Sequence, residues 1–402
     1  MISVAVAGSW LVRRTMWSLD WIRHQSAHGV IDRGLHKHQQ GSVMHRNSAQ
    51  GAGQIIGQMG GLQVIGLDIA KSVFQLHSVD MATGEIVNLQ LKRAKVLEHF
   101  ANRSPCVIGI EACGGAHHWA RELTAQGHTV RLIHAKAVRP FVSGNKTDAT
   151  DARAIWLAVQ QPGTKFVGMK TLAQQATLTL HRQREMLMKM KVMQINALRG
   201  LLYEFGATFA RGRNALFSEI EATLESLANS MPQYVADSLR EQVQRIKQLG
   251  ADIKAVEVRL TAVLRTDTDM RRVAQIPGVG LLTATAAIAT MGQAKAFKSA
   301  REFCAWLGLV PKQRGTGGRV NLLGISKRGD TYLRTLLIHG ARSVLTHAKE
   351  EPGPWLEQLK GRRPANVVIV AQAAKMARTI WAVTARQQDY QRGYQSIRRQ
   401  AA

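Results

Sequence analysis

The sequence is poor in cysteine, in acidic residues and in aromatic residues. Its 402 residues include 3 cysteines, 27 Asp and Glu, and 5% aromatic side chains. Cys106, Cys113 and Cys304 form no CxxC pair, which argues against structural zinc and favours a reducing compartment. No uninterrupted apolar run reaches the ~18 residues of a membrane span, and nothing at the N-terminus has the layout of a secretory signal. We therefore expect a cytoplasmic protein without a membrane partner.

The shortage of acidic residues leaves a large positive charge. Lys and Arg number 54, so the formal net charge is +27. Such an excess opposes compaction unless a polyanion offsets it, and each phosphate contacted by a basic side chain releases counterions. The charge thus predicts a nucleic-acid partner, although it suits a ribosomal or chromatin-like binder as well as an enzyme.

Residues 1–58 differ from the remainder of the chain. They are rich in Gly, His, Gln and Ser and have no sustained hydrophobic period. We interpret them as a disordered or dispensable leader, and Met59 as a candidate start of the functional polypeptide.

From residue 62 onward, strand-like and helix-like segments alternate. Strands are predicted at 62–70, 72–80, 85–93, 106–112 and 128–135, and helices at 94–103 and 116–127. Three strands, a helix, a strand, a helix and a strand are typical of a ribonuclease H-like fold. We therefore predict an α/β domain over 59–165, followed by all-α parts.

The second half of the chain has helical periodicity. Residues 166–268 are predicted to form a helical spacer, in which apolar residues from Ile246 to Val263 repeat at spacings of three and four. This repeat favours a coiled coil slightly over an ordinary bundle helix. Residues 269–386 form a mostly helical unit with a last helix at 365–386, and residues 387–402 form a basic tail.

One segment of the helical unit, IPGVGLLTATAAIATMG at 276–292, is similar to the second half of a helix-hairpin-helix. Its Pro-Gly-Val-Gly turn could direct backbone amides at a phosphate from a helix N-terminus. An ordinary turn between two helices fits equally well.

Four carboxylates stand where simple structural roles explain them poorly. Asp68 lies inside the apolar run VIGLDIA, and Glu111 ends the apolar run VIGIEA. An ionised carboxylate in such a run is costly unless it is paired or bound to a cation. In a ribonuclease H-like sheet these two strands are neighbours, so their acids would converge.

Asp148 and Asp151, in KTDATDARAI, are three positions apart at a helix start and share one face. Taken alone, they are best explained as helix-capping residues. Taken with Asp68 and Glu111, they complete a predicted site for two divalent ions, Mg²⁺ or Mn²⁺, that would clamp a phosphodiester and activate a nucleophile.

Four motifs stand out along the chain: GLDIAKS, GIEACGGAHHWARELTAQGH, KTDATDARAI and FCAWLGLVPKQRGTGGRVNLLGISKRGDTYLRTLLIHGAR. Together they resemble the DEDD transposases of insertion sequences, a family that includes the Piv-type DNA invertases. The resemblance covers roughly residues 60–385. It implies a RuvC-like domain, a coiled-coil spacer and a C-terminal transposase domain. By motif, it makes Asp68, Glu111, Asp148 and Asp151 the metal ligands.

The resemblance also implies a serine nucleophile in the segment that corresponds to RGTGGR. Here Thr316 holds that position, which is a departure from the family pattern, and Ser326 in GISKRGD is the nearby alternative. The glycines Gly317 and Gly318 could allow a phosphate to approach the backbone. The predicted phosphate-binding cations are Arg314, Arg319, Lys327 and Arg328. A flexible basic loop that only grips DNA would explain the same residues.

The resemblance implies strand exchange on double-stranded DNA, at element ends and target, guided by a structured non-coding RNA. It also implies a homo-oligomer, a dimer that assembles to a tetramer, acting in a bacterial cytoplasm at the nucleoid. Two rival hypotheses remain: a RuvC-like nuclease that uses metal-activated water, and a non-catalytic DNA or RNA binder.

Overall fold

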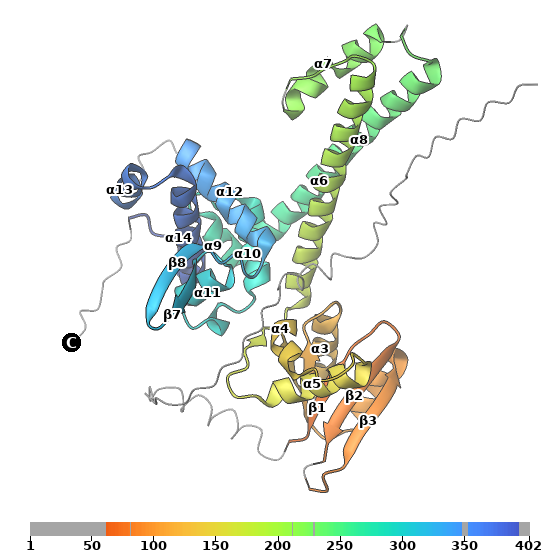
Figure 1. Cartoon of the computed structure of the whole chain (residues 1–402), viewed down its shortest axis with the longest axis vertical. Helices are drawn as coiled ribbons and strands as arrows, with labels where there is room; N and C mark the ends of the chain where they lie inside the picture. Colours follow the sequence, from red (N-terminus) through yellow and green to blue (C-terminus); the bar gives the residue numbers. More distant parts are fainter. Residues whose placement is uncertain (1–61, 81, 211, 228–229, 348–352, 394–402) are drawn as a thin grey trace, which may run out of the picture. The chain divides into compact units, whose positions relative to one another are not determined.

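The computed structural model describes residues 62–393, apart from 81, 211, 228–229 and 348–352 (Figure 1). The predicted leader at 1–58, Met59 and the end of the basic tail lie outside these residues.

The N-terminal part is a mixed sheet with the strand order β3-β2-β1-β4-β5-β6. Its strands are β1 (Val64–Asp68), β2 (Val73–Val79), β3 (Ile86–Lys92), β4 (Val107–Glu111), β5 (Thr129–Ile133) and β6 (Phe166–Val167). β1 is antiparallel to β2 and parallel to β4, which is parallel to β5. The five strands predicted from the sequence are present and in the order expected of a ribonuclease H-like domain. β6 was missed, because two residues are too few to show a period.

Helices cover both faces of this sheet because residues alternate along each strand. The helical elements of this part are η1 (Arg93–Lys95), α2 (Val96–Ala101), α3 (Ala116–Ala125), α4 (Ala135–Val138), η2 (Arg139–Phe141) and α5 (Asp148–Gln160). Ile65 and Leu67 of β1 point into a core shared with α2 and α3. On the opposite face, Ile155 and Val159 of α5 form a second core with β4 and β5.

Glycine at position 66 lets α5 lie directly on β1. A Cβ atom there would lie 2.2 Å from the carbonyl oxygen of Ala152 and 2.6 Å from the amide nitrogen of Trp156. The Trp156 indole N–H donates to the carbonyl oxygen of Val64 over 3.1 Å. The first turn of α5 is therefore held close to the end of β1.

The spacer consists of α6 (Leu172–Glu204), α7 (Arg213–Ser226) and α8 (Gln233–Thr266), and Pro232 caps the start of α8. The apolar repeat predicted from Ile246 to Val263 lies on α8, and Ile246, Ile253, Val256 and Leu260 are buried. The two long helices of the spacer, α6 and α8, pack along each other (Figure 1). The partner of this repeat in the described chain is therefore a helix of the same molecule.

The C-terminal part is mostly helical, as expected. It contains α9 (Thr268–Ala274), α10 (Leu281–Met291), η3 (Ala294–Ala296), α11 (Ala300–Trp306), β7 (Pro311–Thr316), β8 (Arg319–Ile325), α12 (Thr331–His347), α13 (Pro354–Arg362) and α14 (Ala365–Arg386). The predicted last helix at 365–386 is confirmed. Among the described residues, α14 is the one helix long and apolar enough to cross a membrane, but Ile369, Met376 and Ile380 are packed in the core of this part.

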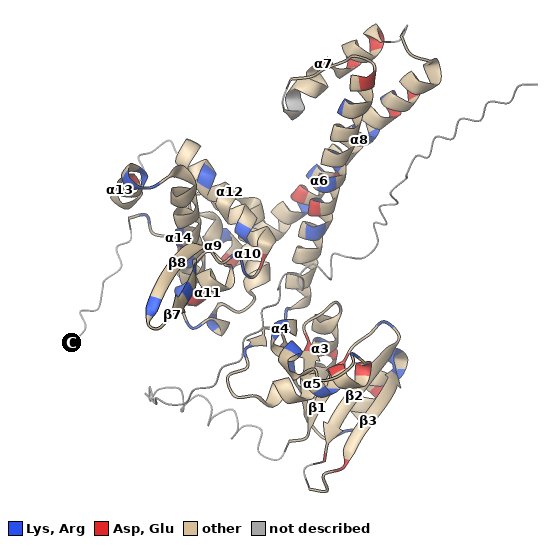
Figure 2. Ribbon diagram, in the orientation of Figure 1, with Lys and Arg blue, Asp and Glu red and all other residues tan. Residues whose placement is uncertain are grey.

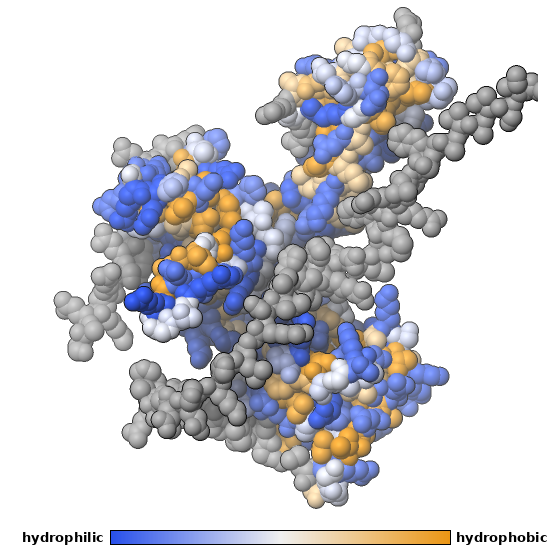
Figure 3. Space-filling model, viewed as in Figure 1, coloured by the Kyte–Doolittle hydropathy of each residue, from blue (hydrophilic) through white to orange (hydrophobic). Residues whose placement is uncertain are grey.

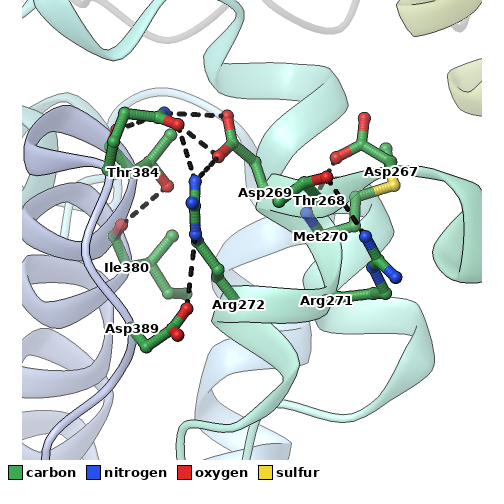
Figure 4. A network of polar contacts seen from close by, with 10 residues as sticks. Asp267, Thr268, Asp269, Met270, Arg271, Arg272, Ile380, Thr384 and Asp389 are labelled. Atoms are coloured by element: carbon green, nitrogen blue, oxygen red, sulfur yellow. Dashed lines mark hydrogen bonds and ion pairs between the residues drawn. The ribbon is translucent and has the colours of Figure 1, made fainter.

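Two polar contacts tie these helices together. On α6, the buried His181 ring lies 2.9 Å from the Thr285 hydroxyl and 3.0 Å from the Tyr332 hydroxyl. Thr285 donates its proton to the carbonyl oxygen of Leu281, so it accepts from His181 Nε2 and Tyr332 donates to Nδ1. Figure 4 shows the second contact, in which Arg272 of α9 pairs with Asp269 and with Asp389, just beyond α14.

The segment IPGVGLLTATAAIATMG forms a turn followed by α10, with α9 before it. Gly278 has a φ of +83°, and a Cβ there would lie 2.8 Å from the carbonyl oxygen of Gly340 on α12. This glycine therefore serves helix packing inside the domain, which favours the ordinary-turn interpretation at this position.

We predict that Gly66→Ala lowers the free energy of unfolding by about 1–3 kcal/mol, because the added methyl must push α5 away from β1. Thermal unfolding of the purified protein measures this. Gly168→Ala is the matched control, since a Cβ at Gly168 meets nothing within 4 Å. Equal unfolding midpoints for Gly66→Ala and wild type would contradict this account of how α5 is seated.

Candidate active site

The four predicted carboxylates converge at one edge of the sheet. Asp68 is the last residue of β1 and Glu111 the last of β4, and these strands run parallel with Leu67 opposite Ile110. The carboxyl ends of neighbouring parallel strands meet at the same edge. Asp148 and Asp151 lie in the first turn of α5, which packs on β1. Figure 2 shows acidic segments in red beside α5 and the neighbouring strands.

The start of α5 is capped by threonines and not by the aspartates. The Thr147 hydroxyl accepts from the Thr150 amide over 3.2 Å, and the Thr147 amide donates to the Thr150 hydroxyl over 2.9 Å. This reciprocal capping box satisfies the helix end. The carboxylates of Asp148 and Asp151 are therefore not needed as capping groups, which was the alternative the sequence left open.

Burial and mutual repulsion act on these carboxylates. Burial, followed by the charges of Asp151, Asp148 and Glu111, raises the pKa of Asp68 to about 6. Burial and then the charge of Asp151 raise the pKa of Glu111. A cation among the oxygens would relieve this repulsion.

Lys146 partly offsets the negative charge, and sequence reasoning had missed it. Its Nζ lies 3.9 Å from Oδ2 of Asp151, and its charge lowers the pKa of both Asp68 and Glu111. The lysine side chain is 83% exposed, so it can swing away from the carboxylates. Its place directly before the capping residue Thr147 was the available signal.

The donor set suits a hard divalent cation, because Mg²⁺ and Mn²⁺ prefer carboxylate oxygens. Within the described residues, however, no three acidic, histidine or cysteine side chains already form a closed metal cage. The four acids are near enough to repel one another and would have to draw together around an ion.

The segment that carries Thr316 is a β-hairpin, which the sequence analysis did not predict. β7 pairs antiparallel with β8, with Thr316 opposite Arg319. The two residues between them, Gly317 and Gly318, have φ angles of +57° and +78°. Tight two-residue hairpin loops of type I′ require positive φ at both positions, which glycine adopts without strain. The Gly-Gly pair thus has a structural role at the hairpin tip.

The hairpin has two different faces. Directly opposed residues lie on the same face, so Arg314, Thr316, Arg319 and Asn321 share one face. The other face carries Val320 and Leu322, which are 62% and 64% exposed. The Thr316 hydroxyl is thus exposed between two arginines, and Figure 2 shows basic segments on this hairpin in blue.

Ser326 lies in a different environment. Its hydroxyl is buried and has no hydrogen-bond partner, while its amide donates to the carbonyl oxygen of Val310 over 2.8 Å. Lys327, the next residue, has a φ of +53°, and Arg334 donates to the carbonyl oxygens of Leu307 and Arg328 over 2.9 Å each. The loop is therefore tightly held, and a phosphate could reach the Ser326 hydroxyl only if the loop moved.

The sheet of the N-terminal part is ribonuclease H-like and carries a cluster of carboxylates at its edge. Together with the mostly helical C-terminal part, this arrangement defines a nucleic-acid enzyme of the DEDD type. Residues 65–206 match a DEDD transposase family, and residues 270–354 match the transposase IS116/IS110/IS902 family. The chain belongs to this family of insertion-sequence transposases, and it is a DNA transposase.

Three curated relatives agree over most of their length. A probable family 20 transposase of Pseudomonas aeruginosa is 44% identical over 336 residues, which cover 83% of this chain and 99% of the relative. The transposase for insertion sequence element IS1111A of Coxiella burnetii is 39% identical over 83% of this chain and 92% of the relative. The transposase for IS1328 of Yersinia enterocolitica is 36% identical, over 81% and 98% respectively.

We predict that Asp68→Asn raises the thermal midpoint when no divalent ion is present. At pH above the raised pKa of about 6, wild type carries a repelled charge in the folded state that the variant lacks. Each kcal/mol gained moves the midpoint of a domain of 150–250 residues by about 2–4 °C. Added Mg²⁺ should then stabilise wild type and have less effect on the variant.

Glu85→Gln is the matched control, because Glu85 is an exposed carboxylate of the same domain. It should change neither the midpoint nor the response to Mg²⁺. Destabilisation by Asp68→Asn without metal, or an equal response of both proteins to Mg²⁺, would count against the repelled carboxylate site.

Proposed function

We propose that this transposase exchanges DNA strands through a covalent protein–DNA ester, with the carboxylate cluster acting as a divalent-metal site. The observation that supports the proposal is that one chain contains both a cluster of acidic side chains and an exposed hydroxyl group. One is the group Asp68, Glu111 and Asp151, whose mutual repulsion a cation would relieve. The other is the exposed Thr316 hydroxyl between Arg314 and Arg319.

In the proposed reaction, the Thr316 oxygen attacks phosphorus and one bridging P–O bond of the DNA backbone breaks. The hydroxyl proton passes to the departing sugar oxygen, so no water is consumed. The bond energy is kept in the threonine ester, and a second DNA hydroxyl later attacks that phosphorus and releases Thr316. A divalent cation held by the acids would polarise the phosphoryl oxygen and assist deprotonation of the nucleophile.

Arginines would stabilise the charge that develops on the phosphoryl oxygens. Arg314 and Arg319 share the face of Thr316, and guanidinium groups match phosphate oxygens by two parallel hydrogen bonds. Exposure favours Thr316 over Ser326 as nucleophile, since the Ser326 hydroxyl is buried. Lys327 and Arg328 are candidates for binding the DNA backbone beside the hairpin.

We further propose that a structured RNA guides the reaction and that the chain acts as a homo-oligomer, a dimer that assembles to a tetramer. The charge of +27 supports binding of more than one nucleic acid. An apolar row on α6 supports self-association: Met186, Met190 and Met193 recur along one face and are 52%, 43% and 59% exposed. Figure 3 shows orange hydrophobic surface along the spacer helices.

We predict that Thr316→Val abolishes the protein–DNA adduct and leaves DNA binding intact, because valine keeps the shape and removes the oxygen. Thr316→Ser should keep or raise activity, since a primary alcohol attacks phosphorus with less crowding. A denaturing gel that resolves protein-linked DNA on nicked substrates measures both results.

Ser326→Ala is the control in the same gel. An adduct that persists in Thr316→Val and disappears in Ser326→Ala would transfer the nucleophile to Ser326. Metal-dependent cleavage without adduct in any variant, wild type included, would favour a nuclease that uses water. An absence of any cleavage by wild type with Mg²⁺ would favour a non-catalytic binder.

The RNA proposal predicts that the protein purified at moderate salt carries one discrete RNA, encoded next to its own gene, and that recombination requires it. Sequencing of the co-purified nucleic acid, followed by nuclease treatment and add-back, measures this. Random cellular RNA in the preparation, together with full recombination on naked DNA, would contradict the guidance.

A further inference from the structure

A second group of basic side chains lies where the residues just before α6 contact α3. His117 and Arg121 lie on α3, Lys170 lies two residues before α6, and Arg182 lies along α6. The Arg121 guanidinium donates to the carbonyl oxygen of Lys170 over 2.9 Å, which fixes the two elements together. None of the motifs recognised in the sequence assigns a role to these residues.

Within this group, two hydrogen-bond donors face each other. The backbone N–H of Lys170 donates to Nδ1 of His117 over 3.2 Å, so Nδ1 carries no proton. In a neutral imidazole the proton then resides on Nε2. That Nε2–H lies 3.3 Å from Nζ of Lys170, which as an ammonium group is also a donor. An acceptor oxygen beside the pair, within hydrogen-bond distance of both nitrogens, would satisfy both donors.

The surrounding charges make the missing partner an anion. Burial, followed by the charges of Lys170, Arg121 and Arg182, lowers the pKa of His117 to about 4. Burial and then Arg182 lower the pKa of Lys170, and Asp330 raises it by less. The Asp330 carboxylate is already accepting the Leu333 amide over 2.7 Å as the cap of α12. The cations therefore repel one another more than the nearby carboxylate compensates.

We propose that His117, Arg121, Lys170 and Arg182 bind a backbone phosphate of nucleic acid. One phosphate oxygen accepts from His117 Nε2–H and from the Lys170 ammonium group, and the arginines neutralise the remaining charge. α3, which carries His117 and Arg121, begins five residues after Glu111 ends β4. The site requires neither the metal nor the hydroxyl chemistry proposed above.

The test measures the affinity of the full-length protein for a short duplex DNA of arbitrary sequence and for a single-stranded RNA of equal length. Lys170→Gln and Arg182→Gln should each weaken binding several-fold at moderate salt. The slope of log affinity against log salt should fall by about 0.9 for duplex DNA, or about 0.7 for a single strand, for each phosphate that the variant no longer neutralises. Weaker binding of one probe only identifies which nucleic acid occupies the site.

The matched control is Lys95→Gln, which also removes one charge from the same domain but at an exposed lysine paired with Glu98. It should leave the affinity and the salt slope almost unchanged, and Lys170→Arg should retain most of the binding. A purely structural role of Lys170 predicts a different pattern: thermal destabilisation with an unchanged salt slope.

The His117 ring supplies an independent readout. A phosphate beside Nε2 favours the charged imidazole, so the pKa of His117 measured by NMR should rise when the probe that occupies the site binds. Arg182 is exposed, so Arg182→Gln decides the question even if Lys170→Gln fails to fold. Unchanged affinity and slope on both probes in Arg182→Gln, with an unchanged His117 pKa on binding, would overturn the proposal.

Discussion

Repulsion among carboxylates is the constraint on which the N-terminal part of this transposase depends. Asp68 and Glu111 end two parallel strands whose register brings them to the same edge, and α5 adds Asp148 and Asp151. The raised pKa of Asp68, about 6, reflects burial and these neighbouring charges. The fold holds the acids together through contacts made elsewhere, in particular through the close approach of α5 to β1 at Gly66 and the threonine capping box. The repelled carboxylates therefore lower the stability of the folded state, and packing in the two hydrophobic cores beneath them compensates for this.

The same logic applies to the excess of positive charge. Lys146 stands among the acids, the hairpin presents Arg314 and Arg319 around Thr316, and a third basic group surrounds Lys170. At the hairpin and around Lys170, like charges lie near one another, an arrangement that is unfavourable in the protein alone and favourable beside a phosphate backbone. The charge that the composition revealed is thus distributed over several local sites, and we propose that nucleic acid links them.

Much of the fold could be predicted because its signals are local. Apolar runs such as VIGLDIA and VIGIEA identify buried strands, and their acidic ends stood out because burial of a carboxylate is costly. β6 and the hairpin were missed for physical reasons. β6 has two residues. In the hairpin, β7 shows no alternation of apolar and polar residues, and the alternation in β8 is confined to Arg319–Leu322, which is too short to indicate a pair of strands. The donor conflict between His117 and Lys170 depends on residues 53 positions apart, which no local pattern reveals.

The central claim is that the carboxylate cluster and the hairpin hydroxyl act on one phosphodiester. The most direct measurement is the yield of covalent protein–DNA adduct from Asp151→Asn with Mg²⁺, compared with wild type at equal DNA occupancy. This substitution leaves the hairpin and Thr316 unaltered and changes only the acidic side. The account predicts that the adduct disappears although DNA remains bound. Adduct formation by Asp151→Asn at the wild-type yield would contradict it, because the hydroxyl would then react without the carboxylates.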